Sequence, residues 1–326
     1  MELVCVGCYT SGAGNGTGIR TYWHDGGTLT PVAELAMSSP SWLTWHPTLE
    51  VLYAANESAD GEITVAVPDD PGSLISVESV PSGGADPCHL VVMPDGRHLL
   101  CSNYSSGSLA VFALDAAGMI TDRTDLVTHE GSGPVADRQD SAHVHTAVVS
   151  GDVVSAVDLG TDEIRSYRLD ANGSLAPLSV SAMPPGTGPR ELLRRPGTDL
   201  AYVAGELAAT LVVVREGPIG TFTPVSVVPA TAGPVEGVNH PAHLELAGDR
   251  LYLSNRGADV LTEFDIASEE PRAVADHPCG AFPRHFAMAD DRFFVAGQKE
   301  DAVVSFAPGG EAVRYPTGTP TCVVFR

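Results

Sequence analysis

Short apolar runs separated by turn residues fill the whole chain, and their apolar positions repeat with a period of two. Residues 108–114, 164–169 and 260–266 are runs of this kind. Gly, Pro, Asn and Asp cluster at the ends of these runs, as is typical of strands joined by tight turns. No segment shows the 3.6-residue period of an amphipathic helix. The pattern therefore predicts an all-β protein.

The strands are arranged in a repeating unit, which we call a phrase. Each phrase opens after a Pro or a similar turn, continues into a second apolar run that ends in a polar or Gly pair, and adds a third and usually a fourth strand. Repeats of about 40–50 residues with four short strands are typical of propeller blades. The residues that open the phrases are Ser41, Cys88, His145, Arg190, Ala242, Arg284 and Thr321.

The two ends of the chain predict one shared blade. The chain begins with strands at residues 3–8, 18–23 and 29–35, and it ends with one further strand at residues 321–325. Joining the C-terminal strand to the N-terminal three removes the open edge that a ring of sheets would otherwise leave. We therefore predict a seven-bladed β-propeller of four-stranded antiparallel blades, closed by the C-terminal strand, as a single domain over residues 1–326.

The segment 186–206 shows how the repeat brings chemistry together. It reads as a hairpin with Arg190 at the start of its first strand and Glu206 at the end of its second. The start of one strand and the end of the next lie at the same edge of an antiparallel hairpin. We therefore expect Arg190 and Glu206 to lie close together.

In a propeller the first strand of each blade lines the central channel, so the strand starts form one ring at one face. The ends of the second strands form another ring there, and its members are Tyr9, Glu57, Tyr104, Leu159, Glu206, Arg256 and Gln298. The residue type changes from blade to blade in both rings, as an asymmetric site requires. The longest connection, residues 128–142, lies on the same face and is a candidate lid or substrate loop.

Histidines near the strand starts suggest acid–base chemistry. His143 and His145 are two residues apart and are expected to point the same way, toward the channel. Imidazole titrates near neutral pH, so either could act as an acid or a base. Two metal ligands and a hydrogen-bonded turn are the alternatives. His89, His243 and His285 each follow a strand start, and alternation is expected to turn them away from the channel, where they would be structural.

Arginines and carboxylates share the two rings. Arg190, Arg256 and Arg284 converge on one face, and guanidinium groups suit carboxylate or phosphate ligands. Glu206 either neutralises an arginine, acts as a base, or positions water. Glu57 is a weaker candidate for the same roles. Solvated or Asp-paired arginines remain the alternative.

Composition narrows the choice of partners. The formal net charge of −23, with a single lysine at Lys299, disfavours nucleic acid and anionic membranes. An anionic substrate must therefore be met by a local arginine cluster. Six cysteines are expected to be small buried hydrophobic residues, because Cys5 and Cys8 have no second pair to complete a zinc site. We see no signal peptide and no apolar stretch of about 18 residues, so we expect a cytoplasmic protein.

Several motifs in combination resemble the lactonase family of seven-bladed propellers, which includes bacterial 6-phosphogluconolactonase and fungal carboxymuconate lactonizing enzyme. The resemblance spans essentially the whole chain. The motifs are Val6-Gly-Cys-Tyr-Thr-Ser-Gly12, Val80-Pro-Ser-Gly-Gly-Ala-Asp-Pro-Cys-His-Leu90, His129-Glu-Gly-Ser-Gly-Pro134, Asp137-Arg-Gln139 with His143-x-His145, Asp158-Leu-Gly-Thr-Asp162, Gly188-Pro-Arg190, Ser254-Asn-Arg-Gly257 and Phe282-Pro-Arg-His-Phe286.

The resemblance implies catalytic roles for a histidine, two arginines and a glutamate at the channel mouth. By motif these are His145, with His143 as the alternative, Arg190, Arg256 and Glu206. Two departures, His243 where the family tends to have Glu and Gly205 where Asn is usual, bear on the substrate. The further substrate-binding candidates are His143, Arg284, Glu57, Tyr104, Gln298 and Gln139.

Three functions follow as hypotheses. The first is a lactonase that needs no metal or other cofactor and hydrolyses a small anionic sugar lactone similar to 6-phosphogluconolactone. The second is a cycloisomerase that closes a carboxymuconate-type diacid with the same residues. The third is a propeller that binds a protein or small ligand without turnover, since a fold does not fix a function. The sequence leaves open whether the protein is a monomer or a dimer.

Overall fold

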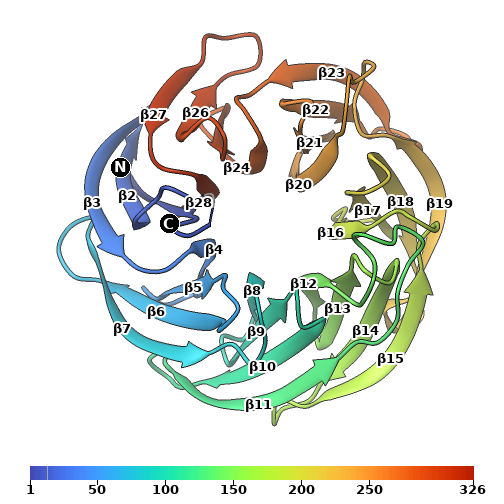
Figure 1. Ribbon diagram of the computed structural model, residues 1–326, viewed down its shortest axis with the longest axis horizontal. Helices are drawn as coiled ribbons and strands as arrows, with labels where there is room; N and C mark the ends of the chain where they lie inside the picture. Colours follow the sequence, from blue (N-terminus) through green and yellow to red (C-terminus); the bar gives the residue numbers. More distant parts are fainter. Residues whose placement is uncertain (13) are drawn as a thin grey trace.

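The computed structural model describes residues 1–12 and 14–326 and arranges them as a ring of seven sheets around a central axis (Figure 1). Each sheet has four antiparallel strands, so the predicted seven-bladed, all-β propeller is confirmed. Within the described residues, the helical content is a single 3-10 turn at Pro218–Gly220. The same residues contain no helix that could cross a membrane.

The inner two strands of each blade position the candidate site. The innermost strands are β4 (Pro40–Trp45), β8 (Pro87–Val92), β12 (Val144–Ser150), β16 (Pro189–Arg194), β20 (His240–Ala247), β24 (Pro283–Ala289) and β28 (Pro320–Phe325). The second strands are β5 (Leu52–Asn56), β9 (His98–Asn103), β13 (Val153–Asp158), β17 (Leu200–Gly205), β21 (Arg250–Arg256), β25 (Arg292–Gly297) and β1 (Glu2–Cys8).

The outer two strands complete each blade. The third strands are β6 (Glu62–Pro68), β10 (Ser108–Leu114), β14 (Glu163–Leu169), β18 (Thr210–Glu216), β22 (Val260–Asp265), β26 (Ala302–Phe306) and β2 (Gly18–Asp25). The outermost are β7 (Leu74–Pro81), β11 (Ile120–Thr128), β15 (Leu175–Ala182), β19 (Phe222–Pro229), β23 (Arg272–Pro278), β27 (Val313–Pro316) and β3 (Thr28–Ala36).

The ring closes through the two ends of the chain, as the sequence predicts. Strand β28 pairs antiparallel with β1, placing Val4 opposite Phe325 and Val6 opposite Val323. Figure 1 shows the dark-red end of the chain against the blue N-terminal strands. The composite sheet therefore has the order β28-β1-β2-β3, and the ring is left without an open blade.

Apolar side chains are buried mainly between neighbouring blades. One core cluster joins Tyr53 and Ile63 of one blade to Leu99, Cys101 and Phe112 of the next. The six cysteines are free and buried, which confirms the expectation that they act as small hydrophobic residues. This burial between sheets holds the inner strands at fixed places around the axis.

Each innermost strand carries a β-bulge close to its start. The register skips one residue after the first paired position on β4, β8, β12, β16, β24 and β28. On β20 it skips two residues, after the second paired position. A bulge leaves an extra residue unpaired and redirects its side chain. The skipped residues are Ser41, Cys88, His145, Arg190, Ala242 with His243, Arg284 and Thr321, and they include every member of the predicted strand-start ring.

The bulges correct one expectation. We expected alternation to turn His89, His243 and His285 away from the channel, between blades, and this is wrong. His243 stacks on His285 with ring centroids 3.9 Å apart, and Trp42 lies 4.5 Å from His89 and 6.4 Å from His243. Trp42 and His243 belong to blades that are not neighbours in the ring, so their contact crosses the axis. The simple alternation fails because the bulge turns two successive side chains inward.

We call Trp42, His89, His243 and His285 the plug. They lie among the walls of a cavity of about 740 Å³ whose other lining residues come from the later part of the innermost strands. None of the plug residues lines the second axial cavity, at the start of those strands, which is described below. The plug therefore belongs to the larger cavity and not to the one at the start of the strands.

Candidate active site

A cavity of about 310 Å³ opens at the end of the channel where the innermost strands begin, and we call this end the mouth. The same backbone hydrogen bond recurs in several blades and shapes this mouth. The N–H groups of Glu57, Tyr104 and Glu206 donate to the carbonyl oxygens of Ser39, Asp86 and Gly188, each over 2.9 Å. These contacts hold each strand end beside the start of the innermost strand in its blade. The lining residues are Tyr9, Glu57, Cys88, Tyr104, Arg138, His145, Glu206, Arg256 and Arg284.

The backbone before Arg190 requires a glycine at position 188. Its φ is +56°, in the left-handed region that favours glycine. A Cβ at this position would also lie 2.3 Å from Cγ of Leu207. The Gly188-Pro-Arg190 segment therefore places Arg190 beside the end of β17.

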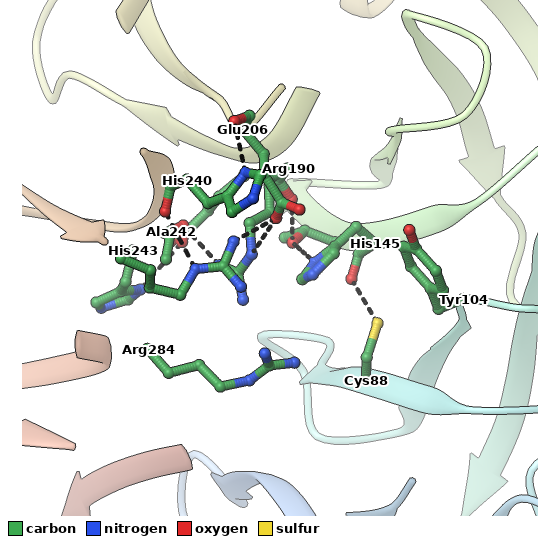
Figure 2. Close-up of polar contacts among 12 residues, drawn as sticks. Cys88, Tyr104, His145, Arg190, Glu206, His240, Ala242, His243 and Arg284 are labelled. Atoms are coloured by element: carbon green, nitrogen blue, oxygen red, sulfur yellow. Dashed lines mark hydrogen bonds and ion pairs between the residues drawn. The ribbon is translucent and has the colours of Figure 1, made fainter. Parts of the chain in front are cut away.

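Glu206 lies at the centre of an arginine cluster. Nη2 of Arg138 donates to its Oε1 over 2.6 Å, and Nη2 of Arg256 donates to its Oε2 over 2.5 Å. Nε of Arg190 lies 3.3 Å from the same Oε2, and Nη1 of Arg190 donates to the carbonyl of Ala242. Figure 2 shows Arg190 and Glu206 meeting above the channel, so the predicted approach of the two hairpin ends is confirmed.

These contacts fix the charge on Glu206. Burial by itself would raise its pKa, but Arg256, Arg190 and His145 together lower the pKa far below its usual range. The side chain is 5% exposed, and both carboxylate oxygens are engaged by guanidinium groups. Glu206 is therefore an ionised anchor for the cations and a poor proton acceptor.

His145 has the opposite electrostatic setting. Burial, followed by repulsion from Arg190, lowers its pKa well below the usual value, so the ring is neutral near pH 7. Its Nδ1 lies 3.3 Å from Oγ1 of Thr146, whose single proton is donated to the carbonyl of Arg190 over 2.7 Å. The hydroxyl oxygen thus accepts from Nδ1–H, which leaves the lone pair on Nε2. Among the described residues, no group hydrogen bonds to Nε2 of His145.

The opposite side of the mouth is loosely paired. Nη2 of Arg284 lies 4.0 Å from Oε2 of Glu57, and its guanidinium lies 5.1 Å from the ring of Tyr9. Tyr9 donates to Oε1 of Glu57 over 2.8 Å. Arg284 makes no hydrogen bond within the described residues, and Figure 2 shows its side chain extending into the channel. Its donors are therefore available to a ligand.

The structure brings some predicted residues into the mouth and leaves others outside it. His145, Glu206, Arg256, Arg284, Glu57 and Tyr104 line the cavity, and Arg190 supports it from behind Glu206. Gln298 is not among the lining residues. His143 was expected to face the channel beside His145, but it precedes β12 and stacks on Tyr104 with centroids 4.4 Å apart.

Gln139 also lies outside the cavity. It is fully buried, its Nε2 donates to the carbonyl of Leu159 over 2.8 Å, and its Oε1 accepts from the N–H of Val135 over 3.1 Å. Its amide is therefore engaged with backbone groups of the 128–142 loop and of β13's end.

Arg138 is the functional candidate that the sequence analysis missed. It comes from the 128–142 loop, where no strand pattern indicates the direction of a side chain. One signal was available, because Arg138 is the cation inside the Asp137-Arg-Gln139 motif on the longest connection. Cys88 and Tyr9 belong to the predicted rings and also line the mouth.

The described residues contain no group of three or more His, Cys, Asp or Glu side chains that could hold a metal ion. The larger axial cavity, beyond the plug, has mainly apolar walls. The arginine cluster, the neutral imidazole and the free guanidinium all lie in the smaller one, which is therefore the candidate active site.

Comparison with known proteins identifies the family. The family described as "Lactonase, 7-bladed beta-propeller" matches residues 3–325. The chain is 27% identical over 308 residues to a 6-phosphogluconolactonase of Bacillus subtilis, covering 91% of this chain and 87% of that one. It is also 27% identical over 315 residues to a 6-phosphogluconolactonase of Formosa agariphila, covering 89% and 88%.

Solved structures show the same likeness. The periplasmic gluconolactonase of Pseudomonas aeruginosa superposes with a TM-score of 0.91 at 28% identity, covering 99% of this chain and 98% of that one. A family match over nearly the full length is decisive. The chain belongs to the lactonase family of seven-bladed β-propellers.

Proposed function

We propose that the protein hydrolyses a small anionic sugar lactone in the mouth, with His145 as the general base. The observation that carries this proposal is a neutral imidazole with an unshared Nε2 beside guanidinium groups that outnumber the carboxylates. The names of relatives from Bacillus subtilis and Pseudomonas aeruginosa support lactones as the substrate class. A cavity of about 310 Å³ suits a single small ring.

The reaction begins with water positioned at Nε2 of His145. The imidazole takes one proton as the water oxygen attacks the lactone carbonyl carbon, and negative charge develops on the carbonyl oxygen. Arg284, whose donors are free, stabilises that charge together with Arg256. Fixed cationic donors in a partly dry site stabilise an oxyanion more strongly than water does.

The ring then opens. The tetrahedral intermediate collapses, the bond to the ring oxygen breaks, and the imidazolium returns its proton to the departing alkoxide. The products are one hydroxyl and one carboxylate, so water is the co-reactant that balances the reaction. Glu206 holds Arg190 and Arg256 in place throughout and takes no proton, so the role of base proposed for it from the sequence passes to His145.

We also propose a different role for Gln139 from the substrate binding expected from sequence. Its buried amide holds the 128–142 loop over the mouth. His143 supports Tyr104 in the same way, since its Nδ1 lies 3.1 Å from the carbonyl oxygen of Tyr104 and its ring stacks on the phenol.

A panel of sugar lactones, assayed with and without a chelator, tests the function. The expected result is hydrolysis well above background that the chelator does not change. His145→Gln should lower kcat/KM for the best lactone by about 100-fold or more, because general-base catalysis contributes 10²–10⁴. A carboxymuconate-type diacid in the panel tests the reverse, lactone-forming reaction.

Two outcomes would contradict the proposal. No turnover of any lactone would favour a binding propeller without chemistry. Full activity in His145→Gln would remove the base from the mechanism while leaving the site in place.

A further inference from the structure

The mouth holds more positive charge than a neutral lactone needs. Four guanidinium groups, those of Arg138, Arg190, Arg256 and Arg284, meet the two carboxylates that line the cavity, so cations outnumber anions by two at the mouth itself. This excess is local, because the whole chain carries a net charge of −23. The oxyanion of lactone hydrolysis accounts for one charge. A second anionic group on the ligand would account for the other.

Arg138 is placed to meet that second anion. Its side chain is 34% exposed, whereas those of Arg190 and Arg256 are 5% and 7% exposed. It comes from the 128–142 loop, whose one lining residue is Arg138, while the other arginines come from strands on the walls. A ligand that enters from solvent therefore reaches Arg138 before the buried pair.

The loop presents Arg138 in a defined position. The N–H groups of Arg138 and Gln139 donate to the carbonyl of Val135 over 2.9 and 2.7 Å, and the N–H of Gly133 donates to the carbonyl of Gln139. A Cβ on Gly133 would lie 2.5 Å from the Gln139 amide, so the loop packs tightly on that side chain. Arg138 is thus held on a folded loop rather than on a loose one.

Arg138 is also the arginine that can leave Glu206 at least cost. Its guanidinium donates to Oε1 of Glu206 and lies 3.4 Å from the hydroxyl of Tyr104. If it moves to a ligand, Glu206 keeps Arg190 and Arg256 on Oε2, and no buried cation loses its partner. If either buried arginine moved, a desolvated charge would be left unpaired.

From this geometry we propose that Arg138 is a specificity-determining residue that binds a phosphoryl group carried by the substrate away from the lactone carbonyl. The inference rests on the proposed lactonase function. On binding, the phosphoryl oxygens replace Oε1 of Glu206 as the acceptors of the Arg138 guanidinium, while the lactone carbonyl faces His145 and Arg284. A planar guanidinium fork suits a tetrahedral phosphate well.

Steady-state kinetics with a matched pair of lactones test this assignment. The pair is 6-phosphogluconolactone and its unphosphorylated parent lactone. We expect Arg138→Ala to raise KM for the phosphorylated lactone by about 10- to 100-fold, the usual range for a lost hydrogen bond between charged groups, with little change in kcat. KM for the unphosphorylated lactone should change by a much smaller factor. For the phosphorylated lactone, the KM of Arg138→Lys should lie between the KM of the wild type and that of Arg138→Ala.

Arg215→Ala is the matched control. Arg215 is paired with Asp199 and Glu269 on the surface, and its replacement removes the same charge from the chain without touching the mouth. Its kinetics with both lactones should equal those of the wild type. Equal losses for both lactones in Arg138→Ala would overturn the proposal and assign Arg138 to the support of Glu206. No loss for either would overturn it as well.

Calorimetry separates this inference from the function on which it rests. Binding of 6-phosphogluconate and of gluconate is measured with the wild type and with Arg138→Ala. If the wild type hydrolyses neither lactone, the proposed function fails, and binding alone decides. A selective loss of 6-phosphogluconate affinity in the variant supports the phosphoryl site. Equal affinity of the wild type for the two acids overturns it.

Discussion

The mouth and the plug are built from neighbouring residues of the same strands, yet they hold charge in opposite ways. Arg284 extends into the mouth and the next residue, His285, belongs to the plug; Cys88 and His89 divide in the same manner. The bulge at the start of each innermost strand makes this division, because it turns two successive side chains toward the axis.

In the mouth, pairing keeps buried groups ionised. Glu206 stays charged because three guanidinium groups surround it, although burial opposes that charge. Arg284 retains its charge as well, since Tyr9 and Glu57 raise its pKa against the effect of burial. The mouth is therefore a site of fixed charge.

In the plug, burial keeps the imidazoles of His89 and His285 neutral. Desolvation, with added repulsion from Arg190 and His243, lowers the pKa of His89 to about 3. The same causes lower the pKa of His285 well below its usual value. The arginine cluster therefore affects both regions. It holds the Glu206 carboxylate ionised in the mouth, and it helps to keep His89 and His285 neutral in the plug. The mouth should thus govern activity, and the plug should govern stability.

The largest expected effect comes from breaking the charge balance of the mouth. Glu206→Gln preserves shape but leaves Arg190 and Arg256 as buried cations without a carboxylate. Removing one partner of a buried ion pair typically costs about 3–5 kcal/mol of folding free energy. We expect a loss of this size in urea unfolding, together with a fall in kcat/KM of more than about 100-fold, because the positioning arginines shift.

Asp199→Asn provides the control for that experiment. Asp199 pairs with Arg215 over 2.7 Å with both side chains well exposed, and such surface pairs contribute at most about 1 kcal/mol. A Glu206→Gln protein as stable as the Asp199→Asn protein would show that the carboxylate does not hold the arginines in place.

A smaller effect is expected from the plug when the pH falls. The folded pKa of His89 is about 3, below its ordinary value near 6.5, so the unfolded chain binds a proton that the folded chain does not. Stability is therefore complete above about pH 6.5 and decreases below it, by about 1.4 kcal/mol per pH unit for each such histidine. His89→Phe should reduce this slope by the contribution of one histidine, about 1.4 kcal/mol per pH unit.

Urea unfolding between pH 6.5 and 5 measures the slope above the range in which ordinary carboxylates titrate. His98, His145 and His285 also have lowered pKa values and should account for the slope that remains in His89→Phe. An unchanged slope in His89→Phe would mean that His89 is not neutral in the folded protein.

Much of the fold and part of the site could be predicted from the sequence, because periodicity reports strands directly. The third strand of the second full blade was expected at residues 108–114 and is found as Ser108–Leu114. The closure by residues 321–325 and the approach of Arg190 to Glu206 also followed from the repeat. These features depend on patterns that recur in each blade.

The remaining features depend on single backbone irregularities. The plug was misplaced because period-two alternation holds only where the register is continuous, and the bulge before His89 breaks it. His143 lies outside β12, so strand alternation does not govern its ring, which stacks on Tyr104 while the ring of His145 meets the same phenol edge-on. Arg138 lies on a loop, where no period relates sequence to direction.

The smallest and sharpest comparison removes one hydrogen bond from each region. Trp42 donates from Nε1 to the carbonyl of Leu90 over 3.1 Å in the plug, and Tyr9 donates to Oε1 of Glu57 over 2.8 Å in the mouth. Tyr9→Phe should lower the free energy of unfolding by about 1 kcal/mol, the usual net value of one such bond. Trp42→Phe should lower it somewhat more, because it also removes one ring of an indole that packs on the three plug histidines.

Their effects on activity should differ, and this difference tests the division of the channel. Trp42→Phe should keep kcat/KM within about twofold of the wild type, since the mouth is untouched. Tyr9→Phe frees Oε1 of Glu57 to pair with Arg284, which withdraws the guanidinium that is otherwise available to the substrate. A fall in kcat/KM of about tenfold is expected, the value of 1.4 kcal/mol in transition-state binding. Equal activity losses in the two variants would mean that plug and mouth act as one unit.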